Sequence, residues 1–482
     1  MKVLFTHSYF LRFDSKQFKT AMPYPPLGTL YAMAFLREKG YEVKLHDTMF
    51  SFSADEILPV LQEFKPDIVV SYDDGFNYLT KMCLTNMREA CFKMQALAKQ
   101  NGCFVITSSS DAADHFEKYI ANDADAIAIG EAEQTVFELC EAFKNASSIE
   151  NINGIAYKKN GSAVKTSKRE VLKDLDHLPP PAWDLLNIEP YKAMWMNAHG
   201  YFSLNFVTTR GCPYKCNWCA KPIYGNRYNS HSPHAIVKQI KEWKNKFGFT
   251  HVWFADDIFG LKPNWLKQFS EAVKLEGLKI RYKIQSRADL LVEENSVKCL
   301  AESGCDTVWM GAESGSQKIL DAMDKGIKVE EIKKAFYLLK QYQIKPALFI
   351  QFGYLGEQLE DIKQTVEMVN ELLPNELGVS VSYPLPGTIF YEKVKEQLVS
   401  KANWTESDDL HLMFKNTYPP QFYRYLHKFL HHTYRINLNK SNEHELHKSY
   451  LRKKGSVMYH KLMRKKVLNS LKKIEPRAAS IF

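Results

Sequence analysis

The sequence predicts an α/β protein with two parallel-sheet regions in tandem, followed by a helical C-terminal region. Three observations predict it. Strand and helix patterns alternate over residues 1–148, a Pro-rich stretch interrupts them at 149–200, and the alternation resumes over 201–400. We therefore expect a doubly wound domain (1–148), a hairpin and linker (149–200), a second α/β domain (201–400) and a helical region with a basic tail (401–482).

The first region contains five short apolar runs of strand length, and helix patterns lie between and after them. The expected strands cover residues 2–8, 42–47, 67–72, 103–109 and 125–130, and the expected helices cover about 27–38, 54–64, 76–100, 115–121 and 135–143. This alternation is typical of a parallel sheet with helices on both faces, whose ligands bind at the carboxyl ends of the strands.

The stretch from 149 to 200 has a different composition. Residues 152–166 alternate like a hairpin, with the turn at Asn160-Gly161. Pro179, Pro180 and Pro181 follow, and three successive prolines cannot lie inside a helix. We expect this stretch to link two folded bodies.

The second region repeats the βα pattern six times. Strands are expected at 202–211, 251–257, 281–287, 307–314, 345–356 and 376–387, with helix patterns between them. Six parallel strands close most simply into a partial barrel, whose active site lies at the carboxyl ends of the strands. The unusual polar residues of this region follow its strands.

Charge is concentrated at the C-terminal end. The formal net charge is +9, and residues 440–482 hold twelve Lys and Arg against three Glu, so the rest of the chain is balanced. The pI therefore does not identify the whole protein as a nucleic-acid binder. A solvated basic helix is the simpler interpretation; contact with anionic lipid, nucleic acid or an acidic partner is the alternative. With no apolar run of spanning length and no signal-peptide pattern, we expect a cytoplasmic protein without a transmembrane span.

Three of the nine cysteines form a motif. Cys212, Cys216 and Cys219 have C-x3-C-x2-C spacing after the first strand of the second region. Three thiolates on one loop can hold three corners of a [4Fe–4S] cluster and leave the fourth iron open. A structural zinc site would need a fourth ligand, for which His231 is the nearest candidate downstream.

With Trp218 before its last cysteine, this motif resembles the signature of the radical S-adenosylmethionine (SAM) superfamily. The resemblance implies that the open iron chelates SAM and that reductive cleavage yields a 5′-deoxyadenosyl radical, which takes a hydrogen from substrate. It also implies an electron donor such as flavodoxin or ferredoxin. The radical and the cofactor supply the difficult chemistry, and the barrel excludes water.

Four further segments resemble the SAM-binding segments of the family. FADDIF suggests contacts to the SAM amino group, QSRADL to ribose and carboxylate, GAESGS to ribose or amino groups, and SYPLPGT to adenine or substrate. The alternatives are helix capping for either aspartate and an ordinary salt bridge for the arginine. With the tryptophan, the expected SAM contacts are Trp218, Asp256, Asp257, Ser286, Arg287, Glu313 and Tyr383.

Three segments carry a further resemblance: PYPPLGTLYAMAFLREKGYEV, DADAIAIGEAEQTV, and the linker from INGIAY to DLDHLPPPAWDLL. Through them the N-terminal region is similar to the cobalamin-binding domain of B12-dependent radical SAM enzymes. The motif D-x-H-x-x-G, whose histidine ligates cobalt, is absent, and His46 lacks its spacing. Relatives often bind cobalamin without that ligand; a domain that has lost cobalamin is the alternative. Backbone amides and small hydroxyls after the strands suit the cofactor. The expected contacts are Tyr72, Asp73, Ser108, Ser109, Ser110, Gly130 and Glu131.

The resemblance implies a cobalamin-dependent radical SAM enzyme, and we favour methyl transfer from methylcobalamin to carbon. The alternative is an oxidative cyclase or rearrangement enzyme, like the anaerobic magnesium-protoporphyrin ester cyclase. A tRNA methylthiotransferase would need a second cluster on N-terminal cysteines, whereas the first cysteine here is Cys83. The intact cysteine motif argues against a non-enzymatic cobalamin-type sensor. The substrate is expected to be a small molecule or a lipid.

Overall fold

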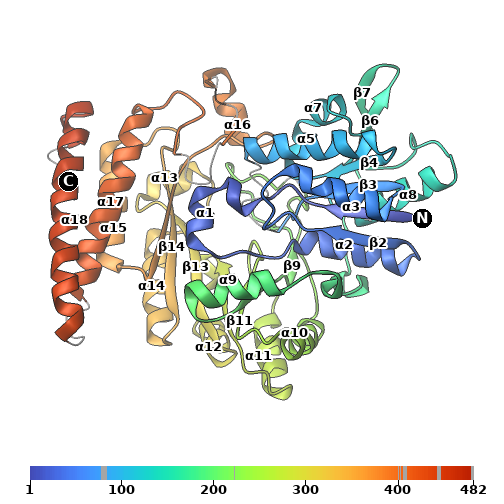
Figure 1. Cartoon of the computed structure of the whole chain (residues 1–482). Coiled ribbons are helices and arrows are strands. Elements are labelled where there is room, and N and C mark those ends of the chain that lie inside the picture. Colours follow the sequence, from blue (N-terminus) through green and yellow to red (C-terminus); the bar gives the residue numbers. More distant parts are fainter. Residues whose placement is uncertain are drawn as a thin grey trace. The chain divides into compact units, whose positions relative to one another are not determined.

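Figure 1 shows the computed structural model of the chain, with its helices and strands labelled. The structure describes residues 1–482 apart from 77–83, 222, 400, 402, 405–409, 442–446 and 479–482, and it describes only the backbone of 441 and 447–453. The chain divides into two compact units. The first comprises Met1–Pro213, Lys221–Tyr282 and Asn403–Asp409, and the second comprises Tyr214–Ala220, Lys283–Ala402 and Leu410–Phe482. The four-part domain division expected from the sequence remains a prediction.

The first unit contains a seven-stranded sheet in the order β2-β1-β3-β4-β5-β6-β7. The five expected strands are present and parallel, which confirms the doubly wound fold. They are β1 (Lys2–Thr6), β2 (Glu42–His46), β3 (Ile68–Tyr72), β4 (Phe104–Ser108) and β5 (Ala126–Ala128). The expected hairpin, β6 (Ile155–Lys159) and β7 (Ser162–Lys165), turns at Asn160 and Gly161 and extends this sheet antiparallel to β5.

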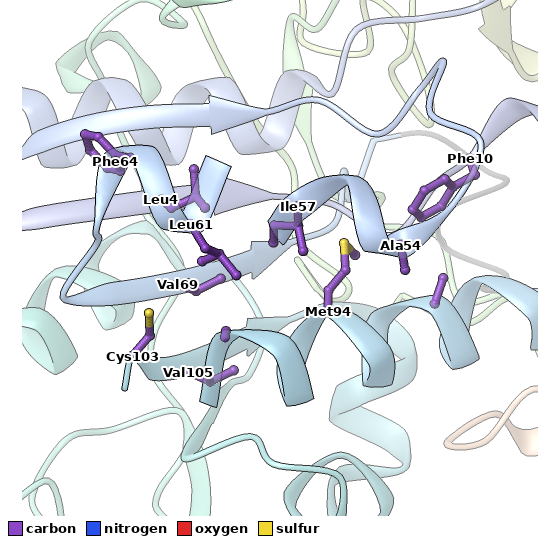
Figure 2. Packing of buried hydrophobic residues seen from close by; sticks show 12 residues of the cluster. Leu4, Phe10, Ala54, Ile57, Leu61, Phe64, Val69, Met94, Cys103 and Val105 are labelled. Atoms are coloured by element: carbon purple, nitrogen blue, oxygen red, sulfur yellow. The ribbon is translucent and has the colours of Figure 1, made fainter. Parts of the chain in front are cut away.

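Helices cover both faces of this sheet. α2 (Leu27–Glu38) contacts α8 (Glu133–Lys144) on one face, and α3 (Ile57–Phe64) contacts α5 (Thr85–Gln100) on the other. Figure 2 shows the core on the second face, where Leu4, Val69 and Val105 of three strands pack against Ile57 and Met94 of the helices. The shorter helices are α1 (Ser15–Thr20), α6 (Ser110–Asp114) and α7 (Phe116–Ala121).

Two helices need comment. The helix expected over about 76–100 is present as α5 from Thr85 to Gln100, and residues 77–83 of that expectation lie outside the described residues. The linker contains an unexpected helix, α9 (Glu189–His199), with Pro190 in its first turn. The buried Trp195 anchors α9, because its indole N–H donates to the carbonyl of Pro23 at 2.8 Å.

The second sheet contains the six strands predicted from the sequence, which confirms the expected partial barrel. Its order is β15-β14-β13-β12-β11-β8, and the pairs β8/β11, β13/β14 and β14/β15 are parallel. These strands are β8 (Ser203–Phe206), β11 (His251–Phe254), β12 (Arg281–Ser286), β13 (Cys305–Glu313), β14 (Lys345–Phe352) and β15 (Glu376–Val381). A short antiparallel pair, β9 (Thr209–Arg210) and β10 (Asn229–Ser230), follows β8.

Helices alternate with these strands, as the sequence predicts. α10 (Pro233–Phe247) shows why: Ser232 caps its first turn, Pro233 opens it, and Gly248 ends it in a left-handed conformation. The other helices between strands are α11 (Trp265–Leu275), α12 (Glu294–Glu302), α13 (Gln317–Ala322), α14 (Val329–Gln341) and α15 (Leu359–Leu372). The 3-10 helices are η1 (Leu11–Phe13), η2 (Ala54–Glu56), η3 (Leu175–His177), η4 (Trp183–Leu185), η5 (Ala288–Leu290) and η6 (Lys395–Gln397).

The C-terminal part of the second unit is helical, as expected. After α16 (Ile389–Val394), α17 (Pro420–Ser441) contacts α15 and β15, and α18 (His447–Ile474) packs beside α17 (Figure 1). Among the residues that the structure describes, no helix is long and apolar enough to cross a membrane.

Candidate active site

The loop that contains the three cysteines begins directly after β9. Gly211 has φ +85°, and a side chain at this position would collide with the carbonyl oxygen of Arg227, so the turn requires glycine. Cys212 follows it and is buried, whereas Cys216 and Cys219 are half-buried. The chain thus enters the cysteine motif through a tightly constrained turn.

Asn217, between the second and third cysteines, anchors the motif within the second unit. It is buried, and the sequence analysis did not single it out. Its N–H and side chain make four hydrogen bonds and its carbonyl accepts a fifth; the partners are Met323 O (3.1 Å), Ala322 O (2.7 Å), Asp324 Oδ2 (2.8 Å), the Tyr354 hydroxyl (2.6 Å) and Phe390 N (2.9 Å). The sequence offered one signal for this role, namely a polar residue inside the cysteine motif. Nothing in the sequence indicated the hydrogen-bond partners of Asn217, which are far away along the chain.

A cation lies beside Cys216. The Nη1 atom of Arg287 is 3.9 Å from the Cys216 sulfur, and its guanidinium lies 3.7 Å from the centroid of the Tyr214 ring. Burial alone would lower the pKa of Arg287, but Asp289 and Cys216 raise it above its ordinary value. A permanently charged guanidinium is suited to a negatively charged metal–thiolate centre.

Glu313 forms a buried ion pair near Trp218. It is the last residue of β13, where the register with β14 shifts and φ is +60°. Its Oε1 atom is 2.9 Å from Lys325 Nζ, which lies 6.0 Å from the Trp218 ring centroid. Burial lowers the pKa of Lys325, but the charges of Glu313 and Cys216 raise it above its usual value. Lys325 is a second residue that the sequence analysis missed.

The segment after Glu313 is tied to α15. Ser314 and the N–H of Gly315 each lie 3.0 Å from the Thr365 hydroxyl, and Ser316 donates to Asp361 at 2.7 Å. Gly315 passes so close to the backbone of Gln364 that a Cβ atom would be 2.5 Å from its carbonyl oxygen. The glycine and serines of GAESGS therefore hold Glu313 in place.

Several buried polar atoms in the cysteine motif and near the ends of β14 and β15 have no protein partner. Within the described part of the chain they include Trp218 Nε1, Gln351 Oε1 of β14 and Ser382 Oγ just after β15. Tyr383, the next residue, is buried, as is Ser286 at the end of β12. Buried polar atoms are normally hydrogen-bonded, so unpartnered ones suit contacts to a bound ligand.

The two aspartates predicted after β11 belong to the first unit and differ in environment. Asp256 is buried and accepts four hydrogen bonds from the N–H groups (2.8 and 2.6 Å) and hydroxyls (3.2 and 2.7 Å) of Thr208 and Thr209. Burial raises the pKa of Asp256 to about 7, and these bonds oppose the shift. Asp257 is exposed. Asp256 therefore fixes the loop that leads from β8 to the cysteine motif.

The strand ends of the N-terminal sheet hold the predicted cobalamin contacts. Asp73 accepts the N–H (2.7 Å) and hydroxyl (2.8 Å) of Ser8, and its own N–H donates to the Ser108 carbonyl at 2.8 Å. Ser109 caps α6 at 2.9 Å, while Ser110 Oγ is buried without a partner. Tyr72 is buried at the end of β3.

Glu131 is engaged by the protein itself. It accepts from Arg210 at 2.5 Å and from the Leu172 N–H at 2.5 Å, and the other Nη atom of Arg210 donates to Glu133 at 2.7 Å. All three side chains are buried, and the rings of Tyr31, Phe76 and Tyr224 lie 5.4–5.6 Å from the guanidinium. Gly130 precedes this cluster with φ +81°. Arg210 lies two positions before Cys212, so its ion pairs with Glu131 and Glu133 connect the start of the cysteine loop to the segment after β5.

The histidines considered as metal ligands have other surroundings. Burial lowers the pKa of His46 to about 4, and His231 is buried with Nδ1 3.1 Å from Asp176. Among the described residues, no group of three His, Cys, Asp or Glu side chains has metal-binding geometry. The fit of a cluster therefore rests on the donor set: three thiols on one short loop, with a cation beside one of them.

Comparisons with known proteins identify a family and related enzymes. Residues 206–369 match the model of the Radical SAM superfamily. The chain is 28% identical over 387 residues to an uncharacterized methyltransferase of Pyrococcus horikoshii. The aligned region covers 79% of this chain and 81% of that protein. It is 25% identical over 408 residues to an anaerobic magnesium-protoporphyrin IX monomethyl ester cyclase of Rubrivivax gelatinosus, covering 83% and 71%.

One solved structure shares the fold over nearly the whole chain. It is the cobalamin-dependent S-adenosylmethionine radical enzyme OxsB with aqua-cobalamin and S-adenosylmethionine bound, at a TM-score of 0.75 and 17% identity, covering 98% of this chain and 73% of that one. This similarity includes both parallel sheets. The comparisons confirm the resemblance drawn from the cysteine motif: residues 206–369, which include Cys212, Cys216 and Cys219, match the Radical SAM superfamily.

Proposed function

We propose that this protein is a cobalamin-dependent radical SAM enzyme that transfers a methyl group to a carbon atom of its substrate. The observation that carries the proposal is architectural. A radical SAM domain with an intact cysteine triad follows a doubly wound sheet in the same chain, and the fold is similar to OxsB over 98% of the chain. The uncharacterized methyltransferase of Pyrococcus horikoshii supports methyl transfer.

Cys212, Cys216 and Cys219 are the proposed ligands of a [4Fe–4S] cluster. Arg287 would balance the negative charge of the thiolates, since it already lies 3.9 Å from one sulfur. Asn217 would keep Cys216 and Cys219 in place through its hydrogen bonds. Arg287 and Asn217 are both buried and hydrogen-bonded to the second unit.

SAM would be bound by polar groups that the fold presents near the cysteine motif. We assign it the Arg287 guanidinium, the Glu313–Lys325 pair and the unpartnered atoms of Trp218 and Ser382. Ser286, Tyr383 and Asp257 stay proposed contacts. Asp256 already has four donors, so its proposed role is to hold the loop before the cysteines.

Cobalamin would lie at the carboxyl ends of the N-terminal strands, where ligands of doubly wound sheets bind. Tyr72, Ser108, Ser110 and Gly130 fit this role, and Ser110 Oγ is a buried atom that needs a partner. The bonds of Asp73, Ser109 and Glu131 assign them mainly to shaping the loops. His46 is not proposed as a cobalt ligand, because it lacks the D-x-H-x-x-G spacing.

When bound, these groups supply a 5′-deoxyadenosyl radical from SAM and a methyl group from methylcobalamin. The chain's own residues bind and orient the two cofactors. Within the second unit, the buried ion pair Glu313–Lys325 keeps the charged side chains that we assign to SAM fixed, so they need little reorganisation during the reaction.

The first experiment is anaerobic purification with hydroxocobalamin, followed by iron, sulfide and cobalt analysis and a visible spectrum. We expect about four iron atoms and about one cobalt atom per chain. Iron without cobalt would leave a radical SAM enzyme whose N-terminal domain lacks cobalamin, and B12-dependent methylation would be rejected.

SAM with an isotope-labelled methyl group separates the two candidate reactions. A methylase places the label in cobalamin and then in product. The second candidate is an oxidative cyclase, which the match to the cyclase of Rubrivivax gelatinosus favours. A cyclase would release 5′-deoxyadenosine while cobalamin and product stay unlabelled.

The partners are proposed by chemical class only. Reductive cleavage of SAM needs an electron donor such as flavodoxin or ferredoxin, which would place the enzyme in the cytoplasm. The proposed substrate is a small molecule or a lipid, because the related cyclase is named for a small molecule, magnesium-protoporphyrin IX monomethyl ester. From Pro420 the described chain is mainly the two helices α17 and α18, and this part offers no support for a methylthiotransferase.

A further inference from the structure

Helix α18 has an unusual composition. Its 28 residues, His447–Ile474, include ten Lys and Arg and no Asp or Glu. A cluster of like charge repels itself and raises the cost of folding unless an anionic partner neutralises it. This charge lies outside the radical SAM domain, so the proposed reaction does not account for it.

One side of α18 packs against the rest of the second unit. His460, Val467 and Leu471 are buried and recur at helical spacing, and Nδ1 of His460 lies 2.8 Å from Nδ1 of His432 on α17. This inner side fixes how α18 is rotated about its axis. The opposite side is therefore presented to the surroundings.

The outer side combines exposed apolar residues with lysines. Met458, Tyr459 and Leu462 are 76%, 55% and 54% exposed. The lysines around them are also exposed: Lys454, Lys461, Lys465, Lys466 and Lys473. Because i and i+4 positions adjoin on a helix, Met458 and Leu462 form one apolar ridge flanked by cations. We call these eight residues the outer face of α18.

This mixture fits the surface of an anionic bilayer. Apolar side chains can enter the headgroup region while lysine stems extend along them and keep their ammonium groups at the lipid phosphates. A nucleic acid would be matched by the charges but would leave the Met458–Leu462 ridge without a role. An acidic protein surface would need an apolar groove of its own as well.

We infer that the outer face of α18 binds the surface of membranes that contain anionic phospholipids. Binding is peripheral: the helix lies along the interface, and its inner side stays on α17. The inference is independent of the reaction proposed above, because it uses no residue of the cysteine motif or of the SAM and cobalamin contacts.

The test is flotation of the full-length, cofactor-loaded protein with vesicles of phosphatidylcholine alone or mixed equally with phosphatidylglycerol. We expect at least about tenfold stronger binding to the anionic vesicles, weakening as salt is raised. Met458→Asp with Leu462→Asp should reduce binding roughly tenfold by placing charge in the interface. Lys461→Glu with Lys465→Glu and Lys466→Glu should abolish it.

Tyr337→Asp is the matched control: Tyr337 is 52% exposed on α14 in the same unit, but α14 contains Glu330 and Glu331 beside its lysines, so it lacks the unbalanced positive charge of α18. It should bind vesicles like the wild type. All variants should keep the wild-type rate of SAM cleavage, which shows that they fold and load their cofactors.

Three results would overturn the inference. They are equal binding to both vesicle types, anionic binding that the Met458/Leu462 change leaves intact, and release of bound protein by single-stranded RNA at low concentration. The last would identify α18 as a nucleic-acid contact. Since these assays measure binding, they stay informative even if methylation is not the reaction.

Discussion

Asp73 and Asp256 follow parallel strands in two different sheets, and each accepts hydrogen bonds from the loop after the neighbouring strand. Asp73 holds Ser8 after β1, and Asp256 holds Thr208 and Thr209 after β8. Both were predicted as cofactor contacts because of their place at a strand end. The structure shows that the same position equally serves to tie two loops together.

At both sets of strand ends, some predicted contacts are paired within the protein and others are not. In the N-terminal sheet, Ser109 and Glu131 are used by a helix cap and an ion pair, whereas Ser110 Oγ is buried without a protein partner. Near the barrel strands, Gln351 Oε1, Ser382 Oγ and Trp218 Nε1 are buried without a protein partner. A strand-end residue is thus a stronger ligand candidate when its buried polar atom has no partner, since the cost of burial then awaits compensation by a ligand.

The largest expected effect is on the cysteine motif. Cys216→Ala removes one thiolate of the proposed cluster, so iron content and SAM cleavage should fall to background while the protein stays folded. The measurements are iron analysis and 5′-deoxyadenosine release. Cys299→Ala, a half-buried thiol on α12, should keep both. Full activity of Cys216→Ala would refute the cluster assignment.

Breaking the buried cluster around Arg210 should have the next largest effect. Arg210→Met leaves Glu131 and Glu133 buried without their cation, which should cost about 3–5 kcal/mol in the free energy of unfolding, measured with urea. The control is Arg37→Met, because the Arg37–Asp184 pair is exposed and should contribute less than about 1 kcal/mol. Similar losses in the two variants would show that Arg210 is not a structural connection.

The raised pKa of Asp256 predicts that the free energy of unfolding depends on pH. Its pKa is raised from 3.8 to about 7 in the folded state, so the folded protein holds this proton more tightly than the unfolded chain. The wild type should therefore lose stability relative to Asp256→Asn as pH rises from about 4 to about 7. Burial also raises the pKa of Asp73, and Asp73→Asn should behave in the same direction. The measurement is urea unfolding across pH; a gain with rising pH would mean that the four hydrogen bonds outweigh burial.

The smallest effects are expected from substituting two serines, one whose hydroxyl is hydrogen-bonded within the protein and one whose hydroxyl is not. Ser109→Ala removes the cap of α6 and should cost about 1 kcal/mol, with SAM affinity unchanged. Ser382→Ala removes a buried hydroxyl without a partner and should stabilise the protein by up to about 1 kcal/mol while weakening SAM binding. Urea unfolding and calorimetric titration with SAM test both. Stabilisation without weaker binding would exclude Ser382 as a SAM contact.

Local sequence patterns were enough to predict most of the fold. The five N-terminal strands, the Asn160–Gly161 turn and the six barrel strands follow from apolar runs and turn residues that act within a few positions. Helix α9 was missed, because its place is set by Trp195 bonding to Pro23, far away in the sequence.

The sequence by itself determined the donor set of the site, because the spacing of Cys212, Cys216 and Cys219 is a property of one continuous loop. Only the tertiary structure decided which residues support that loop. Asn217 meets Tyr354, Glu313 meets Lys325, and Arg210 meets Glu131. These partners come from separate elements that only folding brings within hydrogen-bonding distance, and a buried charge or amide must find such a partner wherever the fold places one.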